Sequence, residues 1–206
     1  MIQEKMKNSR TEIKRLAALE AAAELFLGKG YGSVSMDEIA AKAEISKRTL
    51  YNYFPAKDLL FGEVVRFIWS GLNMPELPPA KGSDIRETLN SFSSKLLAVL
   101  RSERFISLLR LVMGESGRFP ELTKFYSENG ITLILANLAE YFRECTELGM
   151  LKTDRPDIAS QQYLGMIKES LFWPVLLGVF PMPSKEHDED VMEKAADLIL
   201  TVYSFS

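Results

Sequence analysis

The sequence predicts an all-α fold of about nine helices. Apolar residues recur at the three- and four-residue spacing of a helix face, as Leu19, Ala22, Ala23 and Phe26 do near the amino terminus. No segment shows the alternation of apolar and polar residues that is typical of a strand. With 206 residues and a hydrophobic content of 47%, the chain can bury a core in one compact unit or in two closely packed ones.

Three helices are expected at the amino-terminal end. The first covers residues from about 10 to 28 and stops at a run of glycines, which ends the helical pattern. Ser35 then starts a short second helix, because Ser35 and Glu38 form the Ser-x-x-Glu pattern of a capping box. Ser46 starts a third helix, since its hydroxyl can accept a hydrogen bond from a free backbone N–H.

The third helix carries polar side chains that suit a DNA groove. Arg can pair with guanine and Asn with adenine in the major groove, whereas hydroxyls and Lys hold phosphates. For any single residue a solvated helix face is the alternative, and only the whole group favours DNA. The residues on or near the outward face are Lys47, Arg48, Tyr51 and Asn52. The apolar residues expected to hold the second and third helices together are Ile39, Ala43, Ile45, Leu50 and Phe54.

Three amino-terminal segments each match part of a known family pattern in residue type and spacing. They are Ala21-Ala22-x-x-Leu25-Phe26, Ser35-Met36-x-x-Ile39-Ala40 and Ile45-Ser46-x-x-Thr49-Leu50-Tyr51-x-Tyr53-Phe54-x-x-Lys57. With these segments, residues 10–60 resemble the amino-terminal domain of the TetR family of bacterial transcriptional regulators. The resemblance implies that phosphates are held by Ser35, Ser46, Thr49, Tyr53 and Lys57. It implies that base edges are approached by Lys47, Arg48, Tyr51 and Asn52.

Glu44 departs from the family pattern, which commonly has glycine in this turn. Glycine adopts positive φ without steric cost, whereas a residue with a Cβ atom does not. Either Glu44 is strained, or the turn of this chain needs no positive φ.

Charge is unevenly distributed along the chain. The net charge is −3, yet residues 1–60 carry 10 Lys and Arg against 8 Asp and Glu, and the remainder carries 15 against 20. The cations therefore gather where DNA contact is expected. The basic residues at the very start could form an arm on the DNA backbone or a charged tail without order. They are Lys5, Lys7, Arg10, Lys14 and Arg15.

A helix from residue 57 to about 69 is expected to leave the DNA-binding segment. We therefore predict a helix-turn-helix DNA-binding domain over residues 1–56 and a helical effector-binding and dimerisation domain over residues 57–206. A proline-rich break follows the linking helix, and the next helix is expected to begin with Ser83 or Asp84 as its cap.

The second half of the chain predicts three long helices. One is expected over residues 121–148, and another over residues 156–177, with Asp154 as its cap and Pro174 as the residue that kinks or ends it. The last begins near Ser184 with an acidic first turn, which suits the positive end of a helix dipole.

The last helix has an unusually broad apolar arc. Together with the apolar residues that follow residue 170, it predicts half of a two-fold helix bundle, and burial inside the monomer is the alternative. A dimer also suits a helix-turn-helix protein, because two recognition helices must reach half-sites roughly 34 Å apart. The predicted interface residues are Leu171, Phe172, Trp173, Leu176, Val191, Ala195, Leu198, Ile199 and Val202.

Residues 119–180 resemble, less specifically, the carboxy-terminal domain of a TetR subgroup. The segments that carry this resemblance are Pro120-Glu121-Leu122, Leu148-Gly149-Met150-Leu151 and Leu177-Gly178. It implies a hydrophobic small-molecule pocket of the kind often tied to efflux or stress genes. Asn137 and Glu169 are the telling candidates, because burial without partners would be costly for them. All candidates, for which ordinary core is the alternative, are Phe67, Phe105, Leu109, Met113, Tyr126, Asn137, Tyr141, Tyr163, Met166 and Glu169.

These observations favour a cytoplasmic dimeric repressor, which leaves its operator DNA when a small hydrophobic effector binds and needs no cofactor. A ligand-independent architectural or division-linked DNA-binding protein of the same fold is the alternative. An enzyme is disfavoured, because the sequence has one histidine, His187, and lacks a phosphate loop, a nucleophile elbow and metal-ligand spacing. The single Cys145 is expected to be packed inside. The apolar run 171–180 is too short for a membrane span and is expected to be buried helix.

Overall fold

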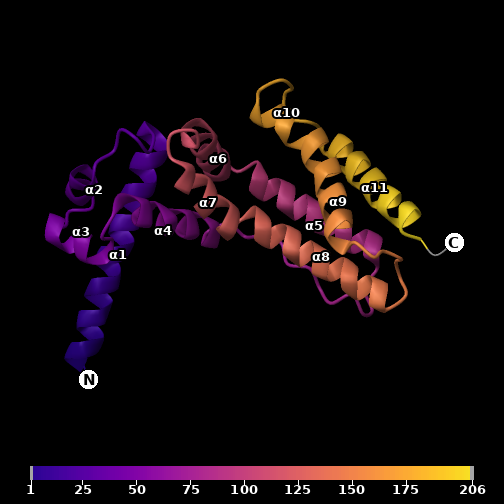
Figure 1. Cartoon of the computed structure of the whole chain (residues 1–206), viewed down its shortest axis with the longest axis horizontal. Coiled ribbons are helices and arrows are strands. Elements are labelled where there is room, and N and C mark those ends of the chain that lie inside the picture. Colours follow the sequence, from indigo (N-terminus) through magenta and orange to yellow (C-terminus); the bar gives the residue numbers. More distant parts are fainter. Residues whose placement is uncertain (1, 205–206) are drawn as a thin grey trace. The chain divides into compact units, whose positions relative to one another are not determined.

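The computed structural model describes the backbone of residues 2–204 and the side chains of residues 10–128 and 130–204. These residues form eleven helical segments and no strand, so the all-α prediction is confirmed. The segments, coloured along the chain in Figure 1, are α1 (Ile2–Lys29), α2 (Met36–Lys42), α3 (Lys47–Tyr53), α4 (Lys57–Ser70), α5 (Ile85–Leu100), α6 (Glu103–Glu115), α7 (Pro120–Asn129), α8 (Ile131–Glu147), α9 (Pro156–Leu171), α10 (Trp173–Leu176) and α11 (Lys185–Val202).

The chain divides into two compact units. Unit 1 consists of Met1–Leu72 and Ser107–Asn129, and unit 2 consists of Asn73–Ile106 and Gly130–Ser206. Unit 1 therefore holds α1 to α4 together with most of α6 and all of α7, while unit 2 holds α5 and α8 to α11. The functional boundary between residues 56 and 57 stays a prediction, because the units describe packing and not activity.

The two short helices of unit 1 begin at the serines that the sequence indicated. Ser35 Oγ accepts a hydrogen bond from the Glu38 N–H, and Ser46 Oγ accepts one from the Thr49 N–H, both at 3.1 Å. The Glu38 carboxylate accepts a hydrogen bond from Lys29, which lowers the pKa of Glu38. The serine hydroxyls thus cap both helix starts, as predicted, whereas the Glu38 carboxylate, expected to complete the capping box, bonds to Lys29.

A cluster of aromatic rings forms the centre of unit 1. The ring of Tyr31, which is 4% exposed, lies 5.4 Å from Phe26, 5.3 Å from Phe61 and 4.8 Å from Phe119 between centroids. Burial, the largest cause, and the charges of Glu121 and Asp58 raise the pKa of Tyr31 to about 12. The turn between α1 and α2 is therefore anchored to the segment between α6 and α7.

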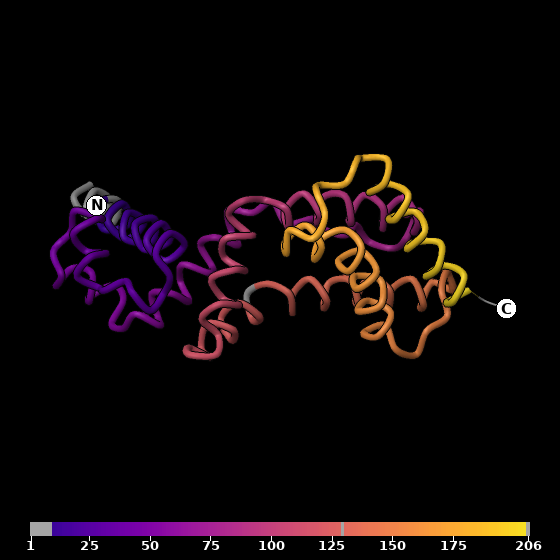
Figure 2. The backbone as a smooth tube through the Cα atoms, turned by 90° about the horizontal axis from the view of Figure 1, so that it is seen from above, coloured from indigo at the N-terminus to yellow at the C-terminus, as the bar shows by residue number. Residues whose placement is uncertain are grey.

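Buried polar bonds join the helices of unit 2, whose backbone Figure 2 traces from above. The hydroxyl of Tyr163 on α9 lies 2.7 Å from Ser93 Oγ and donates to the Leu89 carbonyl at 2.9 Å, so it ties α9 to α5. Arg101, at the end of α5, donates two hydrogen bonds to Asp188 at 2.6 and 2.9 Å and one to the Leu171 carbonyl at 2.8 Å. This guanidinium joins the ends of α5 and α9 to the start of α11.

The predicted single helix over residues 121–148 is wrong. α7 ends at Asn129 and α8 begins at Ile131, with Gly130 as the N-cap between them at φ −136° and ψ −97°. Glycine costs a helix interior about 1 kcal/mol relative to alanine, so the apolar periodicity on either side did not carry the helix through.

The predicted helix over residues 156–177 also stops early. α9 ends at Leu171, and the short α10 holds Pro174 at its start, which agrees with the predicted interruption. Asp154 is not the cap, because Pro156 takes the first helical position and places Arg155 at the cap. The expectation of buried helix to residue 180 is wrong as well, since Phe180 is 63% exposed.

Two further expectations concern the amino terminus. α1 begins at Ile2 and not near residue 10, because Lys, Glu and Gln in this segment are good helix formers. The side chains of Lys5 and Lys7 lie outside the described residues, so an arm on DNA stays a prediction.

Cys145 of α8 is fully buried, as expected. Desolvation raises the pKa of its thiol to about 11. In the part of the chain that the structure describes, no helix combines the length and apolar character that crossing a membrane requires.

Candidate nucleic-acid interface

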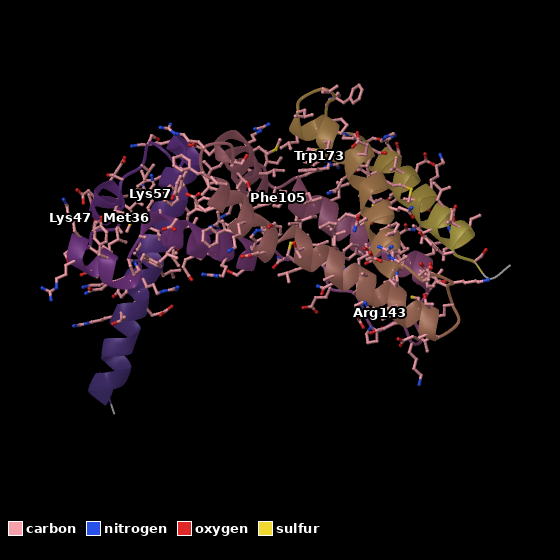
Figure 3. The ribbon with its side chains drawn as sticks, viewed as in Figure 1. Met36, Lys47, Lys57, Phe105, Arg143 and Trp173 are labelled. Carbon is pink, nitrogen blue, oxygen red and sulfur yellow. The ribbon has the colours of Figure 1, made fainter. Side chains whose placement is uncertain are left out.

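α3 exposes a group of polar side chains above a buried base. Leu50 is fully buried and Phe54 is 2% exposed, so α3 is fixed to its unit through these two residues. Figure 3 labels Lys47 at the beginning of this helix. The exposed residues of α3 are Lys47, Arg48, Tyr51 and Asn52, the four for which base contacts were predicted.

Lys47 is oriented by an acidic neighbour. Its ammonium group lies 2.6 Å from Asp37 Oδ2 on α2, and the two side chains are 65% and 57% exposed. Exposed ion pairs contribute little to stability, so Lys47 can leave Asp37 for a phosphate or a base edge. Nothing in the sequence pattern singled out Asp37, because its contact depends on how α2 crosses α3.

Three predicted phosphate ligands are occupied in capping. Ser46 Oγ lies 2.8 Å from Thr49 Oγ1 as well as accepting the Thr49 N–H. Ser35 and Ser46 are exposed and Thr49 is half-buried. The hydroxyls of Ser46 and Thr49 lie at the start of α3, and that of Ser35 lies at the start of α2.

Tyr53 and Lys57 differ from the exposed group. Tyr53 is half-buried, with its ring 6.3 Å from that of Phe54. Lys57, at the start of α4 and labelled in Figure 3, holds its ammonium 4.4 Å from the centre of the Tyr31 ring. Desolvation lowers the pKa of Lys57, while the charge of Glu115 acts in the opposite direction. Lys57 is thus turned toward its own unit.

Glu44 has a positive φ of +54°, so the turn of this chain does need a positive φ. The Glu44 N–H donates to the Ala41 carbonyl at 3.2 Å, and the Ile45 N–H donates to the Ala40 carbonyl at 3.1 Å. These two bonds define a Schellman ending of α2, in which glycine is the preferred residue at the position of Glu44. The first alternative therefore holds, and Glu44 is strained.

The contact of Glu115 with the turn after α1 was not foreseen from the sequence. Glu115 Oε1, at the end of α6, accepts a hydrogen bond from the Gly32 N–H at 3.1 Å. The two residues are 83 positions apart in the chain, so no local pattern signals the contact.

The predicted effector residues fall into both units. Phe67, Leu109, Met113 and Tyr126 belong to unit 1, and the other six belong to unit 2. In unit 1 Met113 is 52% exposed and Leu109 is buried. In unit 2 Phe105 and Tyr163 are core residues, and Tyr163 spends its hydroxyl on the bonds described above. Membership of one pocket stays a prediction for all ten.

Two hollows in unit 2 contain predicted effector residues. Asn137 and Tyr141 line an open cavity of about 430 Å³ between α8 and the segment before α5. Met166 and Glu169 line a groove of about 530 Å³ between α9 and α11. Asn137 and Glu169 are both exposed, so the argument from costly burial does not apply to them.

Several of the predicted dimer residues are buried in the core of unit 2. Leu198 and Val202 of α11 are 52% and 68% exposed, whereas Val191 and Trp173 are half-buried. Exposed apolar residues also follow α10, which the sequence interpretation had not selected: Leu177, Val179, Phe180 and Met182. The residues buried within the unit are Leu171, Phe172, Leu176, Ala195 and Ile199.

Two family models match the chain. Residues 18–64 match the model of bacterial regulatory proteins of the tetR family. Residues 87–205 match the model of the AefR-like transcriptional repressor, C-terminal domain.

Similar proteins agree with these matches. The HTH-type transcriptional regulator YvaF of Bacillus subtilis (strain 168) is 25% identical over 179 residues, covering 83% of this chain and 85% of YvaF. YuxN of the same organism is 39% identical over 56 residues, a match that spans 27% of this chain and only 19% of YuxN.

Solved structures extend the similarity to the whole fold. The flavonoid-responsive regulator FrrA has a TM-score of 0.84 and 30% identity, over 93% of this chain and 97% of FrrA. A TetR-family regulator from Mesorhizobium loti MAFF303099 has a TM-score of 0.78 and 29% identity, over 95% of this chain and 99% of that one.

Proposed function

The chain belongs to the TetR family of bacterial transcriptional regulators, and from this premise we propose that it is a cytoplasmic homodimeric repressor released from operator DNA by a small hydrophobic effector. The observation that carries the DNA-binding part is the surface of α3. Four side chains able to contact bases stand exposed on a helix whose other side is buried. This arrangement suits insertion of α3 into a major groove.

The dimer follows from the requirement for two half-sites and from the surface of α11. Leu198 and Val202 are large apolar side chains that remain exposed beside the groove between α9 and α11. Two copies related by a two-fold axis would cover this surface with itself. Exposed apolar area of this kind favours association.

The effector is proposed to be an aromatic, sparingly polar molecule. FrrA, which resembles the chain over nearly its whole length, is described as responsive to flavonoids, so flavonoids are the first compounds to test. Twelve Phe and nine Met in the sequence suit an adaptable apolar site, and no cofactor is needed for such a response. Release requires tighter effector binding to the DNA-incompetent state, typically by about 1–3 kcal/mol.

An unbiased selection from random duplexes with the purified full-length chain tests DNA recognition. We expect a palindromic site with half-site centres about 34 Å apart. Arg48→Ala, Tyr51→Ala and Asn52→Ala should change the preferred bases, whereas Lys57→Ala should weaken binding to all duplexes. Lys185→Ala, which removes an equal charge from an exposed site in unit 2, is the control. Unchanged binding in all four variants contradicts the assignment of α3.

The same operator then tests effector response. A panel of flavonoids and unrelated aromatic compounds is titrated into the complex, and at least one flavonoid should weaken operator binding by about fivefold or more. If no compound shifts operator affinity or melting temperature, a ligand-independent DNA-binding role is favoured. Consumption of a compound at high protein concentration would instead indicate an enzyme.

Sedimentation tests the dimer. Leu198→Glu and Val202→Glu place charges on the proposed interface and should yield monomers. Leu133→Glu is the matched control, because Leu133 is 54% exposed on α8. Dimers that persist in both α11 variants place the interface elsewhere.

A further inference from the structure

The turn between α1 and α2 is held by α6 through one carboxylate. Glu115 Oε1 accepts the Gly32 N–H at 3.1 Å, and a Cβ atom added to Gly30 would lie only 2.9 Å from the same oxygen. Gly30 also has φ of +86°, a conformation that favours glycine. The carboxylate therefore occupies the space that two glycines leave open.

Beside this turn lies Lys57, a predicted phosphate ligand whose ammonium is turned toward the Tyr31 ring. The ammonium of Lys57 is 4.4 Å from the centre of the Tyr31 ring, and Tyr31 stands between the two glycines that Glu115 approaches. Cation–π attraction and the negative charge of Glu115 both stabilise the ammonium there.

A DNA phosphate would have to draw Lys57 from this position. The ammonium group can move on its four-carbon stem, and a phosphate at the start of α4 would offer it a stronger charge–charge contact than the ring. Whatever stabilises the inward position must then be lost on DNA binding. Glu115, which lies outside the helix-turn-helix, supplies part of that stabilisation.

We propose that Glu115 is a positioning residue for DNA binding, whose carboxylate holds the turn at Gly32 and competes with a DNA phosphate for Lys57. The proposal rests on the proposed function, because it takes Lys57 as a phosphate ligand. It also makes the end of α6 part of the DNA response, since any displacement of Glu115 changes how readily Lys57 is released.

The substitution Glu115→Gln separates the two roles of the carboxylate. The amide oxygen of glutamine can still accept the Gly32 N–H, while the charge that attracts Lys57 is gone. Glu103→Gln is the matched control, because Glu103 is an exposed carboxylate at the other end of α6. It corrects for the general gain in DNA affinity that follows the loss of any negative charge.

Operator and random-duplex affinities are measured over a salt series for the full-length protein and its variants. Glu115→Gln should bind both duplexes about two- to fivefold more tightly than Glu103→Gln does, in line with a partly exposed charge interaction. The gain should vanish in the background of Lys57→Gln. An effect of Glu115→Gln no larger than that of its control, weaker binding, or a gain that persists without Lys57 overturns the proposal.

A spectroscopic measurement follows Lys57 directly. In protein labelled with ¹³C at lysine, the ε-methylene protons of Lys57 should be shifted upfield by the Tyr31 ring and identified by their loss in Lys57→Gln. Addition of operator should remove this shift. A shift that survives in the complex overturns the exchange of partners.

Failure of the inference and failure of the proposed function are distinguishable. If the wild-type chain selects no duplex, both are overturned. If it selects an operator but Lys57→Gln binds as tightly as wild type, only the inference is overturned, and α3 remains the contact with DNA.

Discussion

The two compact units differ in the interactions that stabilise each of them internally. Unit 1 relies on packed aromatic rings around Tyr31 and on ion pairs that remain partly exposed, such as Arg15 with Glu63 at 2.6 Å. Unit 2 relies on hydrogen-bonded groups inside it, at Tyr163 and at the pair of Arg101 with Asp188. Unit 2 also has exposed ion pairs, such as that of Arg143 with Glu140, but it differs from unit 1 in burying polar bonds that join its helices.

The largest expected effect on stability is at Arg101, which tests the buried polar bonds of unit 2. Its side chain and that of Asp188 are only 11% and 15% exposed, so Arg101→Ala would leave Asp188 buried without its partner. We expect the free energy of unfolding to fall by about 3 kcal/mol. Chemical denaturation measures it, with Arg143→Ala as control, because Arg143 pairs with Glu140 at an exposed site. Equal losses in the two variants contradict the claim that unit 2 depends more on its buried polar pair than on an exposed one.

Gly62 tests the close packing of unit 1. A Cβ atom at Gly62 of α4 would lie 2.7 Å from the Phe125 ring of α7, a contact that the rigid ring relieves only by moving. Gly62→Ala should therefore cost about 2 kcal/mol in thermal or chemical unfolding. Gly165 is also inside a helix, but nothing lies within 4 Å of its added Cβ. Gly165→Ala should stabilise by about 0.5–1 kcal/mol, and the same sign for both variants refutes the packing argument.

Tyr163 sharpens the comparison from the side of unit 2. Tyr163→Phe removes the hydroxyl that joins Ser93 and Leu89 inside the core, where burial also raises the pKa of that phenol. We expect a loss of about 1–2 kcal/mol, measured by denaturation. Tyr203→Phe removes an exposed hydrogen bond to Gln162 and should be nearly neutral. Equal stability of the two variants would show that the buried hydroxyl of Tyr163 contributes no more than the exposed one of Tyr203.

The smallest expected effect is a gain at Glu44. Because Glu44 stands at φ +54°, Glu44→Gly should relieve strain and stabilise the protein by about 1 kcal/mol. This corresponds to a rise in melting temperature of roughly 2–4 °C for a chain of this size. Glu44→Ala keeps the strained φ and should bring no gain, so a rise in both variants points to the lost charge instead.

Local signals predicted the end of α1 and the starts of α2 and α3 well. Ser35 and Ser46 each start a helix, because the hydroxyl accepts a hydrogen bond from the backbone N–H three residues later. The glycines that follow α1 end that helix by their own conformational preference. Gly130 shows the limit of such signals. A single glycine inside an apolar periodic segment either remains in a helix or ends it, and tertiary packing decides which.

The candidate DNA-binding surface was partly predictable for the same reason. The exposure of Arg48 and Asn52 follows from helix periodicity and from the burial of Leu50. The inward position of Lys57 does not, because it depends on Tyr31 and Glu115, which reach it only through the folded chain. Likewise the exposure of Asn137 depends on how α8 packs in its unit.

The burial of Cys145 has a practical consequence for measuring these molecules. It is the only cysteine in the sequence, and with a pKa of about 11 roughly one thiol in ten thousand is ionised at neutral pH. Thiol-directed dyes should therefore not react with the folded wild-type chain. A cysteine introduced on the surface can be labelled alone, with the native residue kept in place, so fluorescence reports on a single chosen position.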